Sequence, residues 1–379
     1  MIELPTEAEP VRVIQDDCLE VMPQLPADTF DSVVSDPPYG LGFMGKQWDH
    51  GVPGVPFWTE VRRVLKPGGY MLVMGGSRTY HRLACAVEDA GFEIRDCLMW
   101  VYGSGFPKAK SCLKPAYEPI LLCRKPGKGM RELGIDECRI PANGERLSGG
   151  AVSTTTEGWD RPWKHDEAAV AACRERSAAS VATAEALGRW PANVLHDGSE
   201  EVLEAFAAFG SEKGASGKVT VRNADKFRNT FGDFAGTEED APFYGDSGSA
   251  ARFFYCAKAS RAERDAGLEG MPLVKCGTMQ DDSYRWEHDG KGNKIELSTQ
   301  ARNTHPTVKP IALMKWLVKL VTPPDGLTLD PFAGSGTTGK AAANTGRRAV
   351  LIEREAAYAD IARRRVAEAM GTGLLAGIA

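Results

Sequence analysis

The segment Asp36-Pro-Pro-Tyr-Gly40 combines a carboxylate, two rigid prolines and an aromatic ring. Pro38 holds Pro37 extended, and the two ring-locked φ angles fix the direction of the Pro37 carbonyl beside the Asp36 carboxylate. Two rigid acceptors side by side suit an amino group that carries two hydrogens. Tyr39 offers a face for stacking a planar base taken out of a duplex. The segment indicates chemistry at an exocyclic amine, and the alternative is a proline-rich turn in which Asp36 caps and Tyr39 packs.

A second candidate site is the glycine-rich turn Asp330-Pro-Phe-Ala-Gly-Ser-Gly-Thr-Thr-Gly-Lys340. It follows a predicted strand and opens a predicted helix, where backbone N–H groups favour an anionic ligand group. Its glycines match the dinucleotide fingerprint GxGxxG, and Glu353, 19 residues after Gly334, could accept from ribose hydroxyls. The turn also nearly matches a phosphate-binding P-loop, but Ala341 stands where that motif needs a Mg²⁺-binding Ser or Thr. A tight turn without a ligand is the third interpretation.

Short apolar runs and glycine-marked turns predict the elements that hold these two segments. We expect strands at 11–14, 31–35, 70–74, 92–100, 327–329 and 349–352, and helices at 57–65, 78–90, 311–321 and 356–369. This alternation predicts an α/β fold with helices on both faces of a parallel sheet. Only 40 residues follow Gly339, too few for the βαβαβ half that a nicotinamide site needs, so the other strands must come from residues 11–100.

The order of the two motifs points to a family. Asp36-Pro-Pro-Tyr39 followed much later by Asp330-Pro-Phe-Ala-Gly-Ser-Gly336 resembles the beta class of site-specific DNA amino-methyltransferases, over about 11–125 and 301–379. The resemblance implies a class I S-adenosylmethionine-dependent methyltransferase fold, Rossmann-like and doubly wound, permuted so that the cofactor half comes last. The implied domains are a catalytic half at 1–125, an inserted target-recognition region at 126–300 and a cofactor-binding half at 301–379.

The resemblance also assigns roles to individual residues. Asp36, Pro37, Pro38 and Tyr39 would form the catalytic motif. Asp17 and Cys18 would meet the cofactor adenine, Glu353 would bind its ribose, and Lys309 would pair with its methionine carboxylate. The other implied cofactor residues are Thr307, Asp330, Phe332, Ala333, Gly334, Ser335, Gly336 and Thr337. Without this context, Asp17 would be a helix cap and Lys309 a solvated helix start.

The implied reaction transfers a methyl group from S-adenosylmethionine to the N6 amine of a flipped adenine in double-stranded DNA. Acceptors at the amine hydrogens favour the pyramidal nitrogen that attacks the methyl group in line, so Asp36 would position the amine and take a proton without acting as a nucleophile. An Asp-first motif favours adenine N6, and cytosine N4 is the alternative. From other classes, a dinucleotide-binding oxidoreductase that uses GxGxxG and a catalytically silent DNA-binding protein remain open.

Composition limits the class of protein. With 379 residues, 42% hydrophobic and 26% charged, the chain can form two or three domains and is no disordered tail. A net charge of -5 disfavours nonspecific coating of polyanions. The acidic start and the interrupted apolar runs predict a cytoplasmic protein without a membrane partner. The family resemblance implies that it comes from a prokaryote or phage. Nine cysteines without a CxxC pair predict no metal site and reduced, mostly buried thiols. We expect a monomer or homodimer, with a cognate restriction endonuclease as a candidate partner.

Candidate DNA contacts lie in two segments. Residues 103–131 carry a net charge of +6, and Lys108 and Lys110 there could face phosphates, or belong to an ordinary solvated surface. The loop after the catalytic motif offers Phe43, Lys46 and Trp48, which could close over a flipped base. The insertion could supply base-reading side chains, and its alanine-rich stretch near 168–186 predicts an exposed helix.

Overall fold

The structure is a computed structural model. It describes residues 2–42, 49–103, 111, 113–127, 131–141, 166–207, 249, 251, 254–257, 261–275, 286–288, 294–296 and 300–371. Phe43, Lys46, Trp48, Lys108 and Lys110, the predicted DNA contacts, lie outside these ranges.

A mixed sheet of nine strands forms the centre of the described fold. In spatial order the strands are β1 (Val11–Gln15), β13 (Arg348–Glu353), β12 (Leu327–Asp330), β2 (Phe30–Ser35), β3 (Leu65–Met74), β5 (Tyr117–Arg124), β4 (Glu93–Val101), β6 (Val194–His196) and β7 (Tyr255–Cys256). The strands from β1 to β3 are mutually parallel, and β5 runs antiparallel between β3 and β4. The α/β architecture is confirmed, but the prediction of a purely parallel sheet is wrong at β5.

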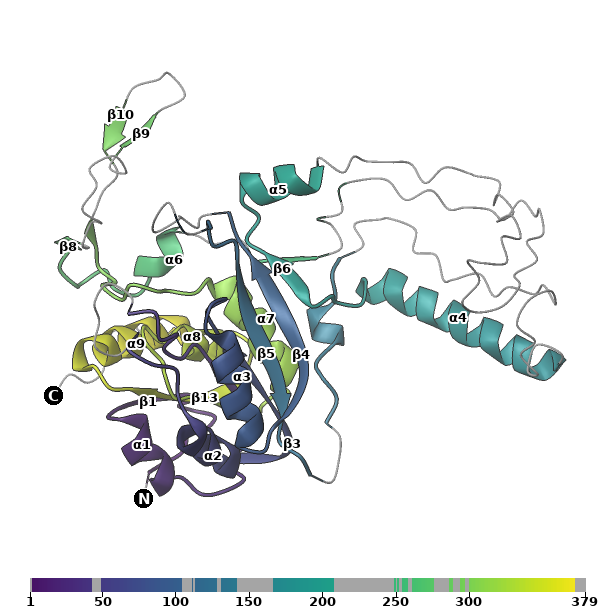
Figure 1. Ribbon diagram of the computed structural model, residues 1–379, viewed down its shortest axis with the longest axis horizontal. Helices are drawn as coiled ribbons and strands as arrows, with labels where there is room; N and C mark the ends of the chain where they lie inside the picture. The colour runs from purple at the N-terminus through teal and green to yellow at the C-terminus, as the bar shows by residue number, and fades with distance from the viewer. Residues whose placement is uncertain are drawn as a thin grey trace. The chain divides into compact units, whose positions relative to one another are not determined.

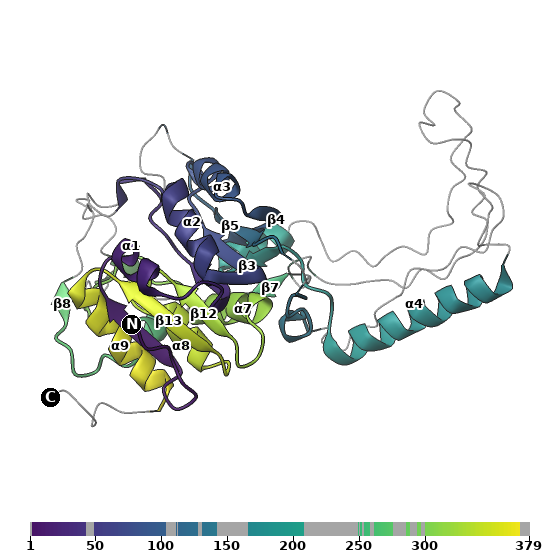
Figure 2. The same cartoon turned by 90° about the horizontal axis from the view of Figure 1, so that it is seen from below.

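Helices cover both faces of this sheet. One face carries α1 (Cys18–Val21), the 3₁₀ turn η1 (Met22–Gln24), α2 (Val55–Val64) and α3 (Tyr80–Asp89), and the other carries α7 (Ile311–Val321), α8 (Thr337–Ala343) and α9 (Ala356–Ala369) (Figures 1 and 2). Apolar residues at helical spacing, such as Trp58 and Val61 of α2, pack against buried strand residues such as Phe30 and Met71. The central strand β2 is therefore buried on both faces, whereas β4 is largely exposed.

The two ends of the chain build one sheet. Val11 pairs with Ala349 in β1 and β13, and Val33 pairs with Leu329 in β2 and β12. The cofactor half predicted at the C-terminus therefore adjoins the half with the predicted catalytic motif.

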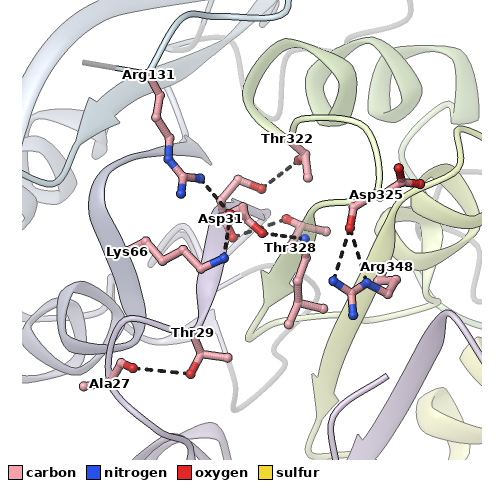
Figure 3. A network of polar contacts seen from close by, with 11 residues as sticks. Ala27, Thr29, Asp31, Lys66, Arg131, Thr322, Asp325, Thr328 and Arg348 are labelled. Carbon is pink, nitrogen blue, oxygen red and sulfur yellow. Dashed lines mark hydrogen bonds and ion pairs between the residues drawn. The ribbon is translucent and has the colours of Figure 1, made fainter. Parts of the chain in front are cut away.

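A buried carboxylate reinforces this junction. Asp31 of β2 accepts hydrogen bonds from the Lys66 ammonium and the Arg131 guanidinium, both at 2.7 Å, and from the backbone N–H of Leu327 in β12 at 2.9 Å (Figure 3). Burial opposes ionisation, but the bonds from Lys66, Leu327 and Arg131 lower the pKa of the Asp31 carboxyl below its usual 3.8. The ionised Asp31 thus stabilises the contact between the two halves.

The chain divides into two compact units that differ from the predicted domains. The first comprises Met1–Glu137, Asn193–Ser199 and Cys256–Ala379, and the second comprises Cys138–Ala192 and Glu200–Tyr255. Parts of the predicted insertion, including β6, thus belong to the unit with the main sheet.

The remaining elements are short except for one helix. The second unit contains α4 (Glu167–Leu187), which buries none of its residues, as predicted for the alanine-rich stretch, and α5 (Glu200–Ala207). The 3₁₀ turn η4 (Asp136–Cys138) lies at the boundary in the chain between the first unit and the second. The first unit adds α6 (Arg261–Asp265) and two small strand pairs: β8 (Val274–Lys275) with β11 (Gln300–Ala301), and β9 (Trp286–His288) with β10 (Lys294–Glu296).

The prediction that the cysteine thiols are mostly buried is only partly right. Of the seven described cysteines, only three are buried: Cys18, Cys123 and Cys138. Three others are exposed, namely Cys85, Cys97 and Cys256, so the expectation of mostly buried thiols is wrong for these residues. Within the described ranges, no helix has the length and apolar character needed to cross a bilayer.

Candidate active site

A cavity of about 760 Å³ lies at the edge of the sheet where β1, β2, β12 and β13 end. This volume is in the usual range for small-molecule sites, and the edge is where open α/β sheets bind ligands. All predicted catalytic and cofactor residues line the cavity except Gly336: Asp17, Cys18, Asp36, Pro37, Pro38, Tyr39, Thr307, Lys309, Asp330, Phe332, Ala333, Gly334, Ser335, Thr337 and Glu353. The fold therefore brings together two motifs that lie almost 300 residues apart in the chain.

Two glycines shape the turn between β12 and α8. Gly334 and Gly336 have φ angles of +52° and +76°, in the left-handed region that side chains rarely adopt. A Cβ atom on Gly334 would lie 2.7 Å from His305 Nε2, and one on Gly336 would lie 2.8 Å from the Cβ atom of Ala362 in α9. Gly334 thus keeps the turn close to the cavity wall, whereas Gly336 permits packing of the turn against α9.

Buried carboxylates hold this turn. Asp330 accepts from the Ser35 hydroxyl at 2.7 Å, from the Phe332 N–H at 3.1 Å and from the Thr338 hydroxyl. Because Ser35 ends β2 and Asp330 ends β12, the first of these bonds links the predicted catalytic and cofactor strands. Burial raises the pKa of Asp330 to about 6.

Glu353 connects the end of β13 to the same turn. Its two carboxylate oxygens accept from the backbone N–H groups of Gly334 at 2.7 Å and Glu355 at 2.8 Å. Burial outweighs these bonds and raises the pKa of Glu353 to about 7. The side chain is therefore fixed at the cavity wall with lone pairs left for further donors.

The wall near β1 combines acidic side chains, a thiol and aromatic rings. Asp17 caps α1 by accepting from the Leu19 N–H at 2.9 Å, and it also lines the cavity. Burial raises the pKa of the Cys18 thiol to about 12, so this sulfur stays protonated. The centroid of the Phe332 ring lies 4.9 Å from that of the Phe57 ring in α2. Acidic, thiol and aromatic groups thus line this part of the site.

The Asp36 carboxylate is bonded through both of its oxygens. The Tyr39 hydroxyl donates to Asp36 Oδ1 and the Lys309 ammonium donates to Asp36 Oδ2, each at 2.7 Å. Lys309 also lies 3.2 Å from Glu118 Oε2. Burial alone would lower the pKa of Lys309, but the carboxylates of Asp36 and Glu118 raise it above its ordinary value. Lys309 is therefore a buried cation that these two acids neutralise.

This arrangement gives Lys309 two partners that were not predicted from the sequence, since its ammonium is bonded to the catalytic motif and to Glu118. Glu118 is within reach because β5 runs antiparallel and so brings its first residues to the edge where the parallel strands end. The pairing of Lys309 with the methionine carboxylate of a cofactor stays a prediction.

Three further residues support the site and were not singled out from the sequence. The first is Glu118, which pairs with Lys309. Asp49 is buried and accepts from the N–H groups of Gly40 at 2.8 Å and Leu41 at 3.2 Å, which fixes the turn after the catalytic motif. His305 lines the cavity, and burial lowers its pKa to about 4, so the imidazole is neutral at pH 7. A periodicity analysis treats such isolated polar residues as solvated, because hydrophobic spacing carries no information about their hydrogen-bond partners.

Part of the basic segment 103–131 is bonded within the fold. Three of its cations form ion pairs within the fold: Arg124 with Glu93, Lys125 with Asp28 and Arg131 with Asp31. Lys114 is exposed. Among the described residues, no group of three or more His, Cys, Asp or Glu side chains is placed to hold a metal ion.

Two known methyltransferases are similar in sequence to short parts of the chain. The chain is 40% identical over 90 residues to the type II methyltransferase M.ScaI of Streptomyces caespitosus, covering 24% of this chain and 30% of that protein. It is 39% identical over 69 residues to the type II methyltransferase M.HinfI of Haemophilus influenzae, covering 18% and 19%. The aligned parts thus span less than a third of these relatives.

The alignments with solved structures cover most of the chain, at low sequence identity. The M1.HpyAVI complex with SAM matches at 15% identity and a TM-score of 0.42, covering 94% of this chain and 98% of that one. The cytosine-N4-specific PvuII DNA methyltransferase matches at 15% identity and a TM-score of 0.47, covering 94% and 86%.

The decisive comparison is with a family model. The model N6_N4_Mtase, described as DNA methylase, matches residues 30–364, which include both motifs that line the cavity. The chain therefore belongs to the N6/N4 DNA methylase family.

Proposed function

We propose that the protein transfers a methyl group from S-adenosylmethionine to the exocyclic N6 amine of an adenine in double-stranded DNA. The observation that carries this proposal is the shared cavity, in which Asp36 and the turn at Gly334 lie at the ends of neighbouring strands linked by the bond from Ser35 to Asp330. Family membership favours this function over the dinucleotide-binding oxidoreductase.

The cavity residues fit the proposed cofactor. Glu353 retains lone pairs for ribose hydroxyls, and Asp17 could accept from the adenine amino group. A Cβ atom at Gly334 would lie 2.7 Å from His305 Nε2, so glycine lets the turn and the imidazole keep their places at the cavity wall. Phe332, Ser335 and Thr337 would line the methionine portion. S-adenosylmethionine would supply an electrophilic methyl group on a sulfonium.

On the substrate side, Asp36 is the proposed acceptor for the amine hydrogens. Tyr39 and Lys309 hold its carboxylate in place, and the Thr79 hydroxyl donates to the Tyr39 carbonyl at 2.7 Å, which fixes the end of the motif. A fixed acceptor favours the nitrogen geometry that attacks a methyl group and offers a site for the released proton. Asp36 would not form a covalent bond to the substrate.

The choice of adenine rests on the Asp-first motif. Cytosine N4 is the second candidate, since its amine presents the same two hydrogens to Asp36. Recognition of a specific DNA sequence by residues 126–300, action beside a cognate restriction endonuclease and a monomeric or homodimeric state belong to the same proposal.

A transfer assay tests the function. Purified protein is incubated with duplex DNA and S-adenosylmethionine labelled in its methyl group, and incorporation into DNA is measured for the wild type and for Asp36→Ala. Asp89→Ala, an exposed residue of α3, is the matched control. We expect transfer by the wild type and the control and none by Asp36→Ala. Full activity of Asp36→Ala would refute the role of Asp36, and absence of transfer by the wild type on DNA of varied sequence would refute the function.

A further inference from the structure

Two hydrogen-bond donors, the Lys309 ammonium and the Tyr39 hydroxyl, each lie near both the Asp36 and the Glu118 carboxylates. The Lys309 ammonium lies 2.7 Å from Asp36 Oδ2 and 3.2 Å from Glu118 Oε2. The Tyr39 hydroxyl lies 2.7 Å from Asp36 Oδ1 and 3.2 Å from Glu118 Oε2. In this state both donors are therefore closer to Asp36, and Glu118 is the second acceptor for each.

These groups are too buried to exchange partners with water freely. The Lys309 side chain is 10% exposed, and those of Asp36 and Glu118 are 20% exposed. A buried ammonium that loses its partner without replacement is strongly unfavourable. Any movement of Lys309 away from Asp36 thus needs another carboxylate within reach.

Such a movement would follow from the proposed role of Asp36. In the described state each oxygen of Asp36 already accepts one short hydrogen bond. A target amine that donates to Asp36 competes with these donors, because an oxygen shared among donors interacts less strongly with each. Charge-assisted bonds such as that from Lys309 are the strongest competitors.

We propose that Glu118 is a positioning residue that takes over the Lys309 ammonium and the Tyr39 hydroxyl when the target amine binds Asp36. Asp36 then accepts from the amine, while the buried cation keeps an ionised partner. The inference deepens the proposed function and rests on the role of Asp36 as amine acceptor.

The sheet explains how Glu118 reaches this place. Glu118 is the second residue of β5 and pairs with Trp100 of β4. Ile120, two residues later, pairs with Met74, the last residue of β3. The reversed strand therefore starts at the edge where β3 ends, and Glu118 joins the cavity opposite Asp36.

The test compares kinetic constants of Glu118→Gln, which retains size and loses charge, with those of Glu118→Asp. Glu93→Gln on neighbouring β4, an acid that pairs with Arg124 outside the cavity, is the matched control. We expect kcat of Glu118→Gln to fall at least about tenfold, with KM for S-adenosylmethionine and for DNA within about twofold of wild type. Glu118→Asp should recover part of kcat because it restores the charge. A kcat within about twofold of wild type for Glu118→Gln would overturn the proposal.

A double variant distinguishes positioning from support of the fold. In Glu118→Gln the ammonium stays on Asp36, so removing it with Lys309→Met should raise kcat of the double variant above that of Glu118→Gln alone. If Glu118 only stabilised the structure, the second substitution would lower kcat further, and that result would also overturn the proposal. Asp36→Ala separates the two hypotheses: its full activity refutes the proposed function, whereas an inactive Asp36→Ala with a fully active Glu118→Gln refutes only the role of Glu118.

Discussion

Replacing Glu353 by glutamine should change how the stability of the protein depends on pH. Glu353 is 9% exposed, and burial raises the pKa of its carboxyl from 4.5 to about 7 in the folded protein. A carboxyl group with a raised pKa binds its proton more tightly in the folded state, so its favourable contribution is present below pH 4.5 and is lost as the pH rises to about 7.

The magnitude follows from the separation of the two pKa values. At about 1.4 kcal/mol per pKa unit, the free energy of unfolding of the wild type should fall by ~3 kcal/mol relative to Glu353→Gln between pH 4.5 and 7.5. Glutamine also loses an acceptor for one of the two N–H groups bonded to Glu353, but that loss does not vary with pH. The difference between the two proteins therefore isolates the titration.

Urea unfolding of the cofactor-free proteins at several pH values measures this difference. Glu88→Gln, an exposed acid of α3, is the control and should follow the wild type at every pH. A difference between wild type and Glu353→Gln that stays constant over this range, or that grows in favour of the wild type as pH rises, would refute the assignment of a buried, proton-binding carboxyl.

Three further predictions address the turn, the loop and the junction of the two halves. Gly334→Ala should weaken S-adenosylmethionine binding at least about tenfold by calorimetry, whereas Gly346→Ala, with a similar φ of +67° and open space around it, should leave affinity unchanged. Equal affinities of these two variants would contradict the steric argument. Asp49→Ala should lower kcat without changing that affinity, because it releases the turn after the catalytic motif, and an unchanged kcat would count against this. Asp31→Asn should reduce the free energy of unfolding by about 3 kcal/mol at pH 7, since two cations lose an ionised partner. This deficit relative to wild type should shrink as the pH falls below 3.8, where the stabilisation by Asp31 is lost.

The elements next to the site could be predicted well because apolar runs end there at glycine, proline or an acid. The prediction for α9 at 356–369 agrees with its observed bounds, and that for β2 at 31–35 differs by one residue. The start of β3 was missed because Lys66-Pro-Gly-Gly69 is typical of a turn. A Cβ atom on Gly69 would lie 2.9 Å from the Asp31 carbonyl oxygen, so the glycine permits the close approach of this strand to β2.

No strand was predicted at the position of β5, and the direction of this strand could not be predicted from its residues either. Ile-Leu-Leu-Cys123 is a buried apolar run whose composition is the same for a parallel or an antiparallel strand. Glu118 was therefore missed, and the ion pairs of Lys309 with Glu118 and Asp36 could not be predicted because these carboxylates lie 191 and 273 residues away in sequence. The two motifs could be identified because each concentrates its chemistry in a few adjacent residues.

Identification of the methylated base tests the central claim most directly. Duplex DNA treated with the purified protein and S-adenosylmethionine would be digested to nucleosides and analysed by mass spectrometry, with Asp36→Ala in parallel. We predict N6-methyladenine with the wild type and no methylated base with Asp36→Ala. Methylation confined to cytosine N4 would contradict the adenine assignment, and equal methylation by Asp36→Ala would contradict the mechanism.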